Sequence, residues 1–228
     1  MLEASNILQY VEDYKKIRFD HEEFTKKMAF LLDNLFEQEN IEYIKPIEYR
    51  TKDIISFEEK LKRKKYTNPL KQITDLSGCR VIIYHPYELK NIVDILYDNF
   101  KIDKKNSVDK RQILKKNQFG YRGIHFILSL KKDRLELPEY MKYKGLKFEL
   151  QILTICEYTW ATLQRNIEYK IENLISGELS RRLSRLSALL ELADEEFQNI
   201  QNKSIIEIID YGGFGLTHKI RFKMGLPL

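Results

Sequence analysis

Two kinds of apolar spacing alternate along this chain of 228 residues, and no other feature limits the possible folds as strongly. Apolar residues three or four apart indicate helices, whereas β-branched runs and strict alternation indicate strands. Helical spacing fills the outer parts of the chain, and strand patterns lie between them. The chain is therefore predicted to be an α+β protein with a mixed central sheet of about five strands, flanked by helices and by N- and C-terminal helical segments.

The predicted elements divide the chain into an N-terminal helical segment at 1–44, a central domain with C-terminal helices at 45–203 and a tail at 204–228. Helices are expected at 2–40, 54–65, 87–100, 155–175 and 178–203. Strands are expected at 47–52, 78–84, 121–130 and 147–153, with a further possible strand at 216–222.

Three local features refine this outline. Asp20 is placed to cap a second helix within the N-terminal segment. Pro46 is expected to break the chain ahead of the first strand. Residues 101–118 are polar and charged without a clear period, so a mobile loop is expected there.

Composition favours a folded protein that does not cross a membrane. Hydrophobic residues make up 43% of the chain, and it has only nine Gly and five Pro. No apolar run approaches the roughly 18 residues of a membrane helix. Cys79 and Cys156 form no CxxC pair and lie in apolar contexts, which favours buried free thiols in a reducing cytoplasm. The net charge of +5 permits a nucleotide or RNA ligand without requiring one.

Basic and hydroxyl side chains gather where the first predicted strand runs into a helix. Arg50 and Lys52 lie two apart on the strand, so both point to one face. Ser56 and Lys60 lie four apart on the following helix, again on one face. This grouping is typical of a phosphate site, and a solvated basic edge is the alternative interpretation.

Asp75 stands at the head of the buried strand predicted at 78–84. A carboxylate in this place can hold Mg²⁺, because hard cations prefer oxygen ligands. It could equally cap a turn or pair with Arg80, and the sequence leaves these alternatives open.

Two strand ends carry the remaining candidate residues. Gly120 and Gly123 let the backbone come close to a ligand, and Tyr121 between them offers a flat face for stacking a base. Glu149 and Gln151 lie two apart on one face of a later strand. A carboxylate there could accept a proton or bind a metal ion.

The histidines argue against one class of enzyme. The chain has four, which are scattered, and they show neither a His-Asp pair nor the spacing of metal ligands. Metal-dependent hydrolysis is therefore poorly supported.

Together, these segments resemble the stand-alone synthetase domain of the RelA/SpoT family, the small alarmone synthetases. The matching segments occur in family order: RTKDIISFEEKLKRK at 50–64, DLSGCRVI at 75–82, GYRGIH at 120–125 and ELQILTICEYTWATLQRNIEYK at 149–170. The resemblance implies a pyrophosphokinase that transfers a pyrophosphate group from ATP to a ribose 3′-hydroxyl, with Mg²⁺ as cofactor.

The resemblance also implies roles on the donor side. Arg50 and Arg80 would sandwich the adenine of ATP by cation–π stacking. The ATP phosphates would be held by Lys52, Ser56 and Lys60.

On the acceptor side, the resemblance implies that Tyr121 stacks on the base, while His125 and Gln151 line the pocket. Asp75 and Glu149 would bind Mg²⁺, and Glu149 would help to deprotonate the attacking hydroxyl.

Departures from the family pattern lie mainly on the acceptor side. Leu153 replaces an Arg of the family, Arg165 stands where a His is common, and Asn117 and Phe119 precede GY where a Lys and a small or amide residue are usual. Basic groups near the 5′-phosphates of an acceptor nucleotide are thus partly lost. That loss suits the branch of toxic small alarmone synthetases, which modify the 3′ CCA end of tRNA.

The favoured hypothesis is therefore a toxin that pyrophosphorylates tRNA, arrests translation and is held silent by an antitoxin protein. Basic clusters that could follow an RNA backbone, unless they are solvated helix faces, lie at Lys26-Lys27, Lys62-Arg63-Lys64-Lys65 and Arg181-Arg182. A second hypothesis is a synthetase of guanosine alarmones from GDP or GTP. A third is a non-catalytic nucleotide- or RNA-binding module, against which the retained motif residues argue.

Overall fold

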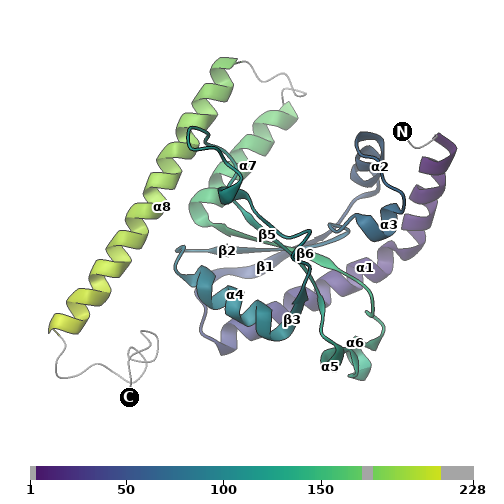
Figure 1. Cartoon of the computed structure of the whole chain (residues 1–228), viewed down its shortest axis with the longest axis horizontal. Coiled ribbons are helices and arrows are strands. Elements are labelled where there is room, and N and C mark those ends of the chain that lie inside the picture. The colour runs from purple at the N-terminus through teal and green to yellow at the C-terminus, as the bar shows by residue number, and fades with distance from the viewer. Residues whose placement is uncertain (1–3, 171–176, 212–228) are drawn as a thin grey trace.

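A computed structural model describes residues 4–170 and 177–211 (Figure 1). The elements are α1 (Ala4–Gln38), β1 (Tyr43–Thr51), α2 (Ile54–Arg63), α3 (Pro69–Gln72), β2 (Ser77–Ile83), α4 (Glu88–Asn99), β3 (Phe100–Ile102), β4 (Val108–Asp109), the 3-10 turn η1 (Lys110–Gln112), β5 (Ile124–Leu130), α5 (Lys132–Leu135), α6 (Pro138–Met141), β6 (Phe148–Thr154), α7 (Ile155–Lys170) and α8 (Gly177–Tyr211).

The strands form one mixed sheet in the order β1-β2-β6-β5-β3, and β4 pairs with β5 off this path. Strands β2 and β6 are parallel, and the other pairs are antiparallel. The predicted α+β class with a mixed sheet is confirmed, with six strands rather than about five. The prediction of a mobile loop at 101–118 was wrong in part, because β4, η1 and the end of β3 lie there. Such short strands leave no periodic pattern to read.

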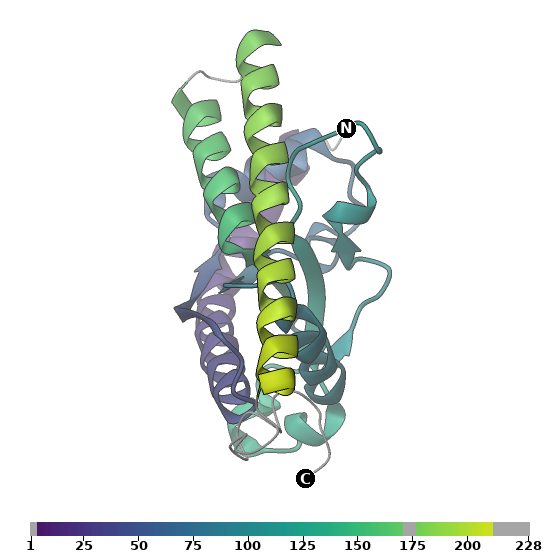
Figure 2. The same cartoon turned by 90° about the vertical axis from the view of Figure 1, so that its left-hand side faces the viewer.

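Helices cover both faces of the sheet (Figures 1 and 2). On one face, α1 and α4 pack against alternate residues of the central strands, and Phe24, Met28, Val81 and Ile152 lie in this core. Helix α7 packs against β2 and β6 on the other face, and α8 lies beside α7 and passes the ends of these strands. Since side chains alternate along a strand, residues between the core positions point toward α7 and α8. The candidate site lies on that second face.

Two local predictions were wrong. Helix α1 is one continuous helix of 35 residues, so Asp20 lies inside it and caps nothing. The apolar spacing continues across Asp20, and tertiary packing outweighs the capping signal. Pro46 lies within β1 at an irregularity between Ile44 and Glu48 instead of ahead of the strand. β1 is an edge strand, where the missing N–H of a proline is tolerated.

The C-terminal helix extends beyond its predicted end at residue 203, because α8 continues to Tyr211. The possible strand at 216–222 and the predicted last turn of the helix at 155–175 lie outside the described residues. The division of the chain into 1–44, 45–203 and 204–228 stays a prediction. The three short helices α3, α5 and α6 were not predicted.

Two expectations from composition concern the whole molecule. Cys79 and Cys156 are both free and buried, as predicted. Within 4–170 and 177–211, no helix combines the length and the apolar character that crossing a membrane requires.

Candidate active site

A row of polar side chains crosses the sheet on the face covered by α7 and α8. The strand register places Glu48 of β1 beside Arg80 of β2, Arg80 beside Gln151 of β6, and Gln151 beside His125 of β5. The Arg80 guanidinium donates to Glu48 at 3.1 Å and twice to the Gln151 amide oxygen at 3.3 and 3.1 Å. Four strands thus contribute one connected polar row.

Glu149 lies at the centre of a second set of contacts on the same face. Its two oxygens accept from Gln151 Nε2 at 2.7 Å and from His125 Nδ1 at 2.9 Å. Burial opposes ionisation of Glu149 and Asp75 opposes it further, but the hydrogen bonds from His125 and Gln151 hold its pKa below the usual value. Glu149 is therefore an ionised carboxylate at neutral pH.

The hydrogen bonds also fix the state of His125. An ionised carboxylate only accepts hydrogen bonds, so the Nδ1 of His125 carries a proton. Its Nε2 lies 2.8 Å from the hydroxyl of Tyr121 and accepts from it in the neutral ring. Tyr121, His125 and Glu149 form one hydrogen-bonded line that ends at a carboxylate.

Asp75 binds two lysines at the other end of the site. Its oxygens accept from Lys52 Nζ and Lys60 Nζ, each at 2.9 Å. Burial acts to raise the pKa of Asp75, but the two lysines outweigh it and hold the pKa below its usual value. Of the alternatives left open by the sequence, pairing with Arg80 is not what the structure shows, because Arg80 bonds to Glu48.

The local sequence explains how Lys60 reaches Asp75. Asp53 caps α2 by accepting from the backbone N–H of Ser56 at 2.8 Å. This cap fixes where the helix begins, so Ser56 and Lys60 lie one turn apart on the same face. The four donor-side residues from Arg50 to Lys60 therefore gather at one end of β1 and the start of α2.

Three arginines line one pocket of about 100 Å³ between β1, β2 and α7, namely Arg50, Arg80 and Arg165. Burial, together with the positive charges of Arg80 and Arg50, lowers the pKa of Arg165. Arg50 and Arg165 have no ion pair within the described part of the chain. Such a pocket suits a flat, electron-rich ring and nearby negative charge.

Apolar packing surrounds Gly123 on the acceptor side of the site. Leu153 is buried on the same face as Glu149 and Gln151, two residues further along β6. A Cβ atom at Gly123 would lie 3.1 Å from Leu153 and 2.4 Å from the hydroxyl oxygen of Tyr121. Only glycine leaves room here for Tyr121 in its observed position.

Comparison with known proteins agrees with this arrangement. Residues 49–173 match the model of the region found in RelA / SpoT proteins. The chain belongs to the RelA/SpoT family. It is a pyrophosphokinase of the RelA/SpoT type.

Individual relatives resemble most of this chain. The GTP pyrophosphokinase YwaC of Bacillus subtilis (strain 168) is 30% identical over 165 residues, which cover 69% of this chain and 75% of that protein. Small alarmone synthetase 2 of Bacillus subtilis superposes with a TM-score of 0.69 at 25% identity, covering 84% of this chain and 99% of that one. The structure of small alarmone synthetase 1 from Bacillus subtilis bound to its product pppGpp superposes with the same TM-score at 21% identity, covering 84% and 98%.

The two carboxylates fit the divalent metal that members of the RelA/SpoT family typically use. Asp75 and Glu149 are near enough for the charge of Asp75 to raise the pKa of Glu149. Mg²⁺ usually takes one or two carboxylates and completes its shell with phosphates and water. No group of three or more potential ligands lies among the described residues, and none is needed for such a site. Asp75 and Glu149 would hold the ion, which would neutralise charge on the ATP phosphates.

The predicted basic clusters lie on different sides of the molecule. The cluster at 62–65 lies at the C-terminal end of α2, beside the donor site, and Lys62 pairs with Glu58. Lys26 and Lys27 lie on α1, which covers the opposite face of the sheet, and the Lys27 amine lies 5.1 Å from the ring centre of Tyr140. Arg181 and Arg182 lie near the start of α8.

Several residues of the site escaped sequence reasoning. Glu48 could have been found, because it precedes Arg50 by two positions on the same strand face. Tyr158 donates to Glu48 at 3.1 Å, and its ring lies 5.7 Å from the Arg80 guanidinium. Its contact with residues far earlier in the chain gave no sequence signal.

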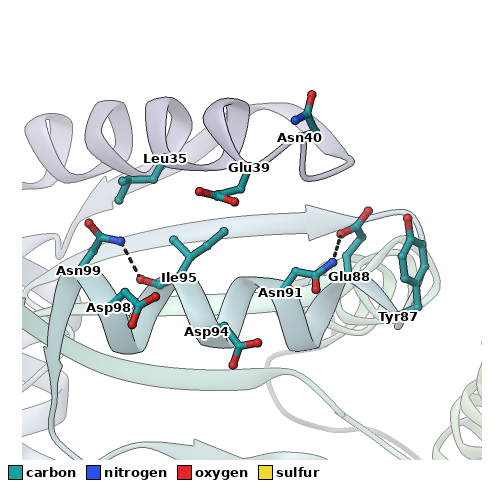
Figure 3. A pocket seen from close by; sticks show the side chains of 10 residues that line it. All are labelled: Leu35, Glu39, Asn40, Tyr87, Glu88, Asn91, Asp94, Ile95, Asp98 and Asn99. Atoms are coloured by element: carbon teal, nitrogen blue, oxygen red, sulfur yellow. Dashed lines mark hydrogen bonds between the residues drawn. The ribbon is translucent and has the colours of Figure 1, made fainter. Parts of the chain in front are cut away.

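A second pocket, between α1 and α4, does not suit a nucleotide (Figure 3). Its volume is about 330 Å³, and its charged lining residues are all acidic: Glu39, Glu88, Asp94 and Asp98. Carboxylates repel phosphate groups, so the arginine-lined pocket on the other face is the better candidate for ATP.

Proposed function

We propose that this pyrophosphokinase transfers the β,γ-pyrophosphate of ATP to the ribose 3′-hydroxyl at the CCA end of tRNA. The observation that carries the chemistry is the line from Tyr121 through His125 to Glu149. It joins an aromatic side chain to an ionised, part-buried carboxylate. A base stacked on Tyr121 would bring its ribose hydroxyl toward a group able to accept the proton.

The donor enters between β1, β2 and α7. Adenine stacks between Arg50 and Arg80, and Lys52, Ser56 and Lys60 bind the phosphates. Asp75 keeps the two lysines in place until phosphate oxygens compete for them. These residues position the β-phosphorus and stabilise the charge that develops on the transferred group.

The transfer needs no covalent enzyme intermediate. The ribose oxygen attacks the β-phosphorus, the bond from that phosphorus to the oxygen of the α-phosphate breaks, and AMP leaves. Glu149 accepts the hydroxyl proton, and His125 holds the carboxylate in place through its Nδ1–H. Gln151 orients the other carboxylate oxygen.

The choice of tRNA as acceptor rests on Leu153. This position lies on the same face as Glu149 and Gln151, next to Gly123, and its side chain is buried and uncharged. The terminal adenosine of tRNA has no 5′-polyphosphate, so it needs no cation there. We propose that the basic end of α2 at 62–65 follows the RNA backbone. A neutralising antitoxin protein and a cytoplasmic location complete this proposal.

A guanine nucleotide is the second candidate acceptor. YwaC is named a GTP pyrophosphokinase, and small alarmone synthetase 1 has been solved with pppGpp. Burial raises the pKa of Tyr121 to about 12, and the nearby Arg165 opposes this rise. Arg165 therefore lies where it could meet the phosphates of a nucleotide stacked on Tyr121. GDP or GTP would then replace tRNA.

The decisive experiment incubates the protein with γ-labelled ATP and offers deacylated tRNA, GDP or GTP. Label in tRNA alone is expected. Charge reversal of Lys62 and Lys64 should weaken transfer to tRNA and reduce its salt dependence, whereas reversal of Lys26 and Lys27 on the opposite face serves as the comparison. Label in GDP or GTP alone, lost on Arg165→Ala, would overturn the tRNA proposal and support alarmone synthesis.

A further inference from the structure

Helices α7 and α8 hold the acceptor loop, which we define as residues 119–123, on both sides of Tyr121. Ser187 of α8 donates to the carbonyl oxygen of Gly120 at 3.1 Å. Arg122 forms ion pairs with Glu191 of α8 at 2.5 Å and with Glu157 of α7 at 3.7 Å. The two neighbours of Tyr121 in the chain are therefore both fixed to the helical layer.

These ion pairs are largely removed from water. The side chain of Glu157 is 9% exposed, and those of Arg122 and Glu191 are each 23% exposed. Attraction between opposite charges is stronger where solvent screens it less. The contacts can therefore fix the backbone of Arg122 as surface pairs cannot.

The helical layer that grips Arg122 is itself tied to the catalytic strand. Thr154, the last residue of β6, donates to Asp194 of α8 at 2.6 Å. Trp160 of α7 donates to the carbonyl oxygen of Leu183 in α8 at 2.9 Å. Strand β6 also carries Glu149. The acceptor loop and the Glu149 carboxylate are therefore held in position by the same strand.

We propose that Arg122 is a positioning residue: its ion pair with Glu191, supported by the contact with Glu157, keeps Tyr121 in the place where the acceptor base stacks. Helix α8 is then a part of the acceptor site although it contributes no group to the chemistry. This inference rests on the proposed role of Tyr121. It adds that acceptor affinity depends on a helix far along the chain from every donor residue.

Kinetics with both substrates test this inference. Arg122→Ala and Glu191→Gln should each raise the acceptor KM about tenfold, because each change removes one partner of a part-buried ion pair. The ATP KM should stay within about twofold, since the donor residues do not touch the loop. Arg122→Lys should raise the acceptor KM less than Arg122→Ala does. The double variant Arg122→Ala/Glu191→Gln should have an acceptor KM no higher than that of the more impaired single variant. Glu195→Gln, exposed on α8, is the matched control.

Fluorescence gives an independent readout of the loop. Trp160 is the only tryptophan in the sequence, and a Cβ atom at Gly120 would lie 3.9 Å from its ring. Its emission should shift to the red in Arg122→Ala and Glu191→Gln, as the loop loosens and water enters, and should not shift in Glu195→Gln.

The outcomes separate this inference from the proposed function. Equal changes in both KM values, or an unchanged acceptor KM in Arg122→Ala, would overturn the positioning role. If Tyr121→Ala raises the acceptor KM while Arg122→Ala does not, only the present inference fails. If Tyr121→Ala leaves the acceptor KM unchanged, the proposed acceptor site itself is wrong.

Discussion

The donor half and the acceptor half of the site are built in different ways. The donor half comes mainly from one stretch of chain, residues 48–80, which holds β1, α2, α3 and β2, and α7 adds Arg165. The acceptor half gathers a loop, β5, β6, α7 and α8, with residues from 119 to 194. Local spacing suffices to assemble the first, whereas the second depends on the complete tertiary fold.

The two halves also differ in how their charges are balanced. On the donor side, Asp75 is shared by two cations, Lys52 and Lys60. On the acceptor side, Glu149 is bonded by His125 and Gln151 and has no lysine or arginine partner among the described residues. Substitutions in the two halves should therefore affect different kinetic constants.

The largest effect is expected for Asp75→Asn. This change leaves Lys52 and Lys60 without their shared carboxylate and removes a proposed metal ligand, so turnover should fall by roughly 10³-fold or more and the ATP KM should rise. Initial rates with labelled ATP measure both constants. Glu58→Gln, on the same helix as Lys60 but paired only to Lys62, should behave like the native protein. Near-native turnover of Asp75→Asn with an unchanged circular dichroism spectrum would show that Asp75 has no catalytic role.

Glu149→Gln should reduce turnover by about 10²–10⁴-fold, because the amide cannot accept the hydroxyl proton. The ATP KM should change little, in contrast to Asp75→Asn. The rate should no longer depend on ionisation of a carboxylate at acid pH. A large rise in the ATP KM would remove the distinction between the two halves.

Arg50→Ala should raise the ATP KM by about three- to thirtyfold, since a cation–π contact contributes about 0.5–2 kcal/mol. The acceptor KM should remain unchanged. Arg50→Lys tests whether the flat guanidinium is needed, because lysine keeps the charge but loses the stacking plane. Parallel changes in both KM values would place Arg50 in the acceptor half as well.

The smallest effect concerns Glu157. Burial and the nearby Asp194 raise its pKa to about 7, although the Thr154 N–H, Arg111 and Arg122 act to lower it. Glu191 and Cys156 also line the surrounding pocket. A carboxyl with a raised pKa in the folded state makes folding less favourable as pH rises from its unfolded pKa, 4.5, to about 7.

Between pH 6 and pH 8, native stability should therefore fall by about 1 kcal/mol from this group alone. Glu157→Gln should lose this dependence, which denaturant unfolding at the two pH values would measure. If the variant keeps the native pH dependence, Glu157 does not titrate in this range. Glu178→Gln, exposed at the start of α8, is a suitable control.

The grouping of the donor-half residues could be read from the sequence because its geometry is local. Arg50 and Lys52 share a strand face, Ser56 and Lys60 share a helix turn, and Asp75 follows within the next segment. The bonds from Asp75 to both lysines were nevertheless not predicted, since several partners were compatible with the spacing. Long periodic elements such as α1 were found, but the two-residue strand β4 was not.

The acceptor half was predicted only as a set of isolated residues. Tyr121, His125 and Glu149 were each selected, but their hydrogen-bonded line depends on β5 pairing with β6. The grip of Glu191 on Arg122 joins residues from a loop and a distant helix. A single sequence contains no signal for such a pair, because the apolar stripe of α8 indicates packing without showing its partner.

The side chain of Gln151 makes the two halves depend on each other. Its oxygen accepts from Arg80 and its nitrogen donates to Glu149, so only one orientation of the amide satisfies both. If Arg80 moves onto an incoming adenine, the amide of Gln151 can rotate, and its hydrogen bond to Glu149 then changes. Nucleotide preference and proton transfer therefore cannot evolve separately here: a change at either end must preserve a side chain that donates on one side and accepts on the other.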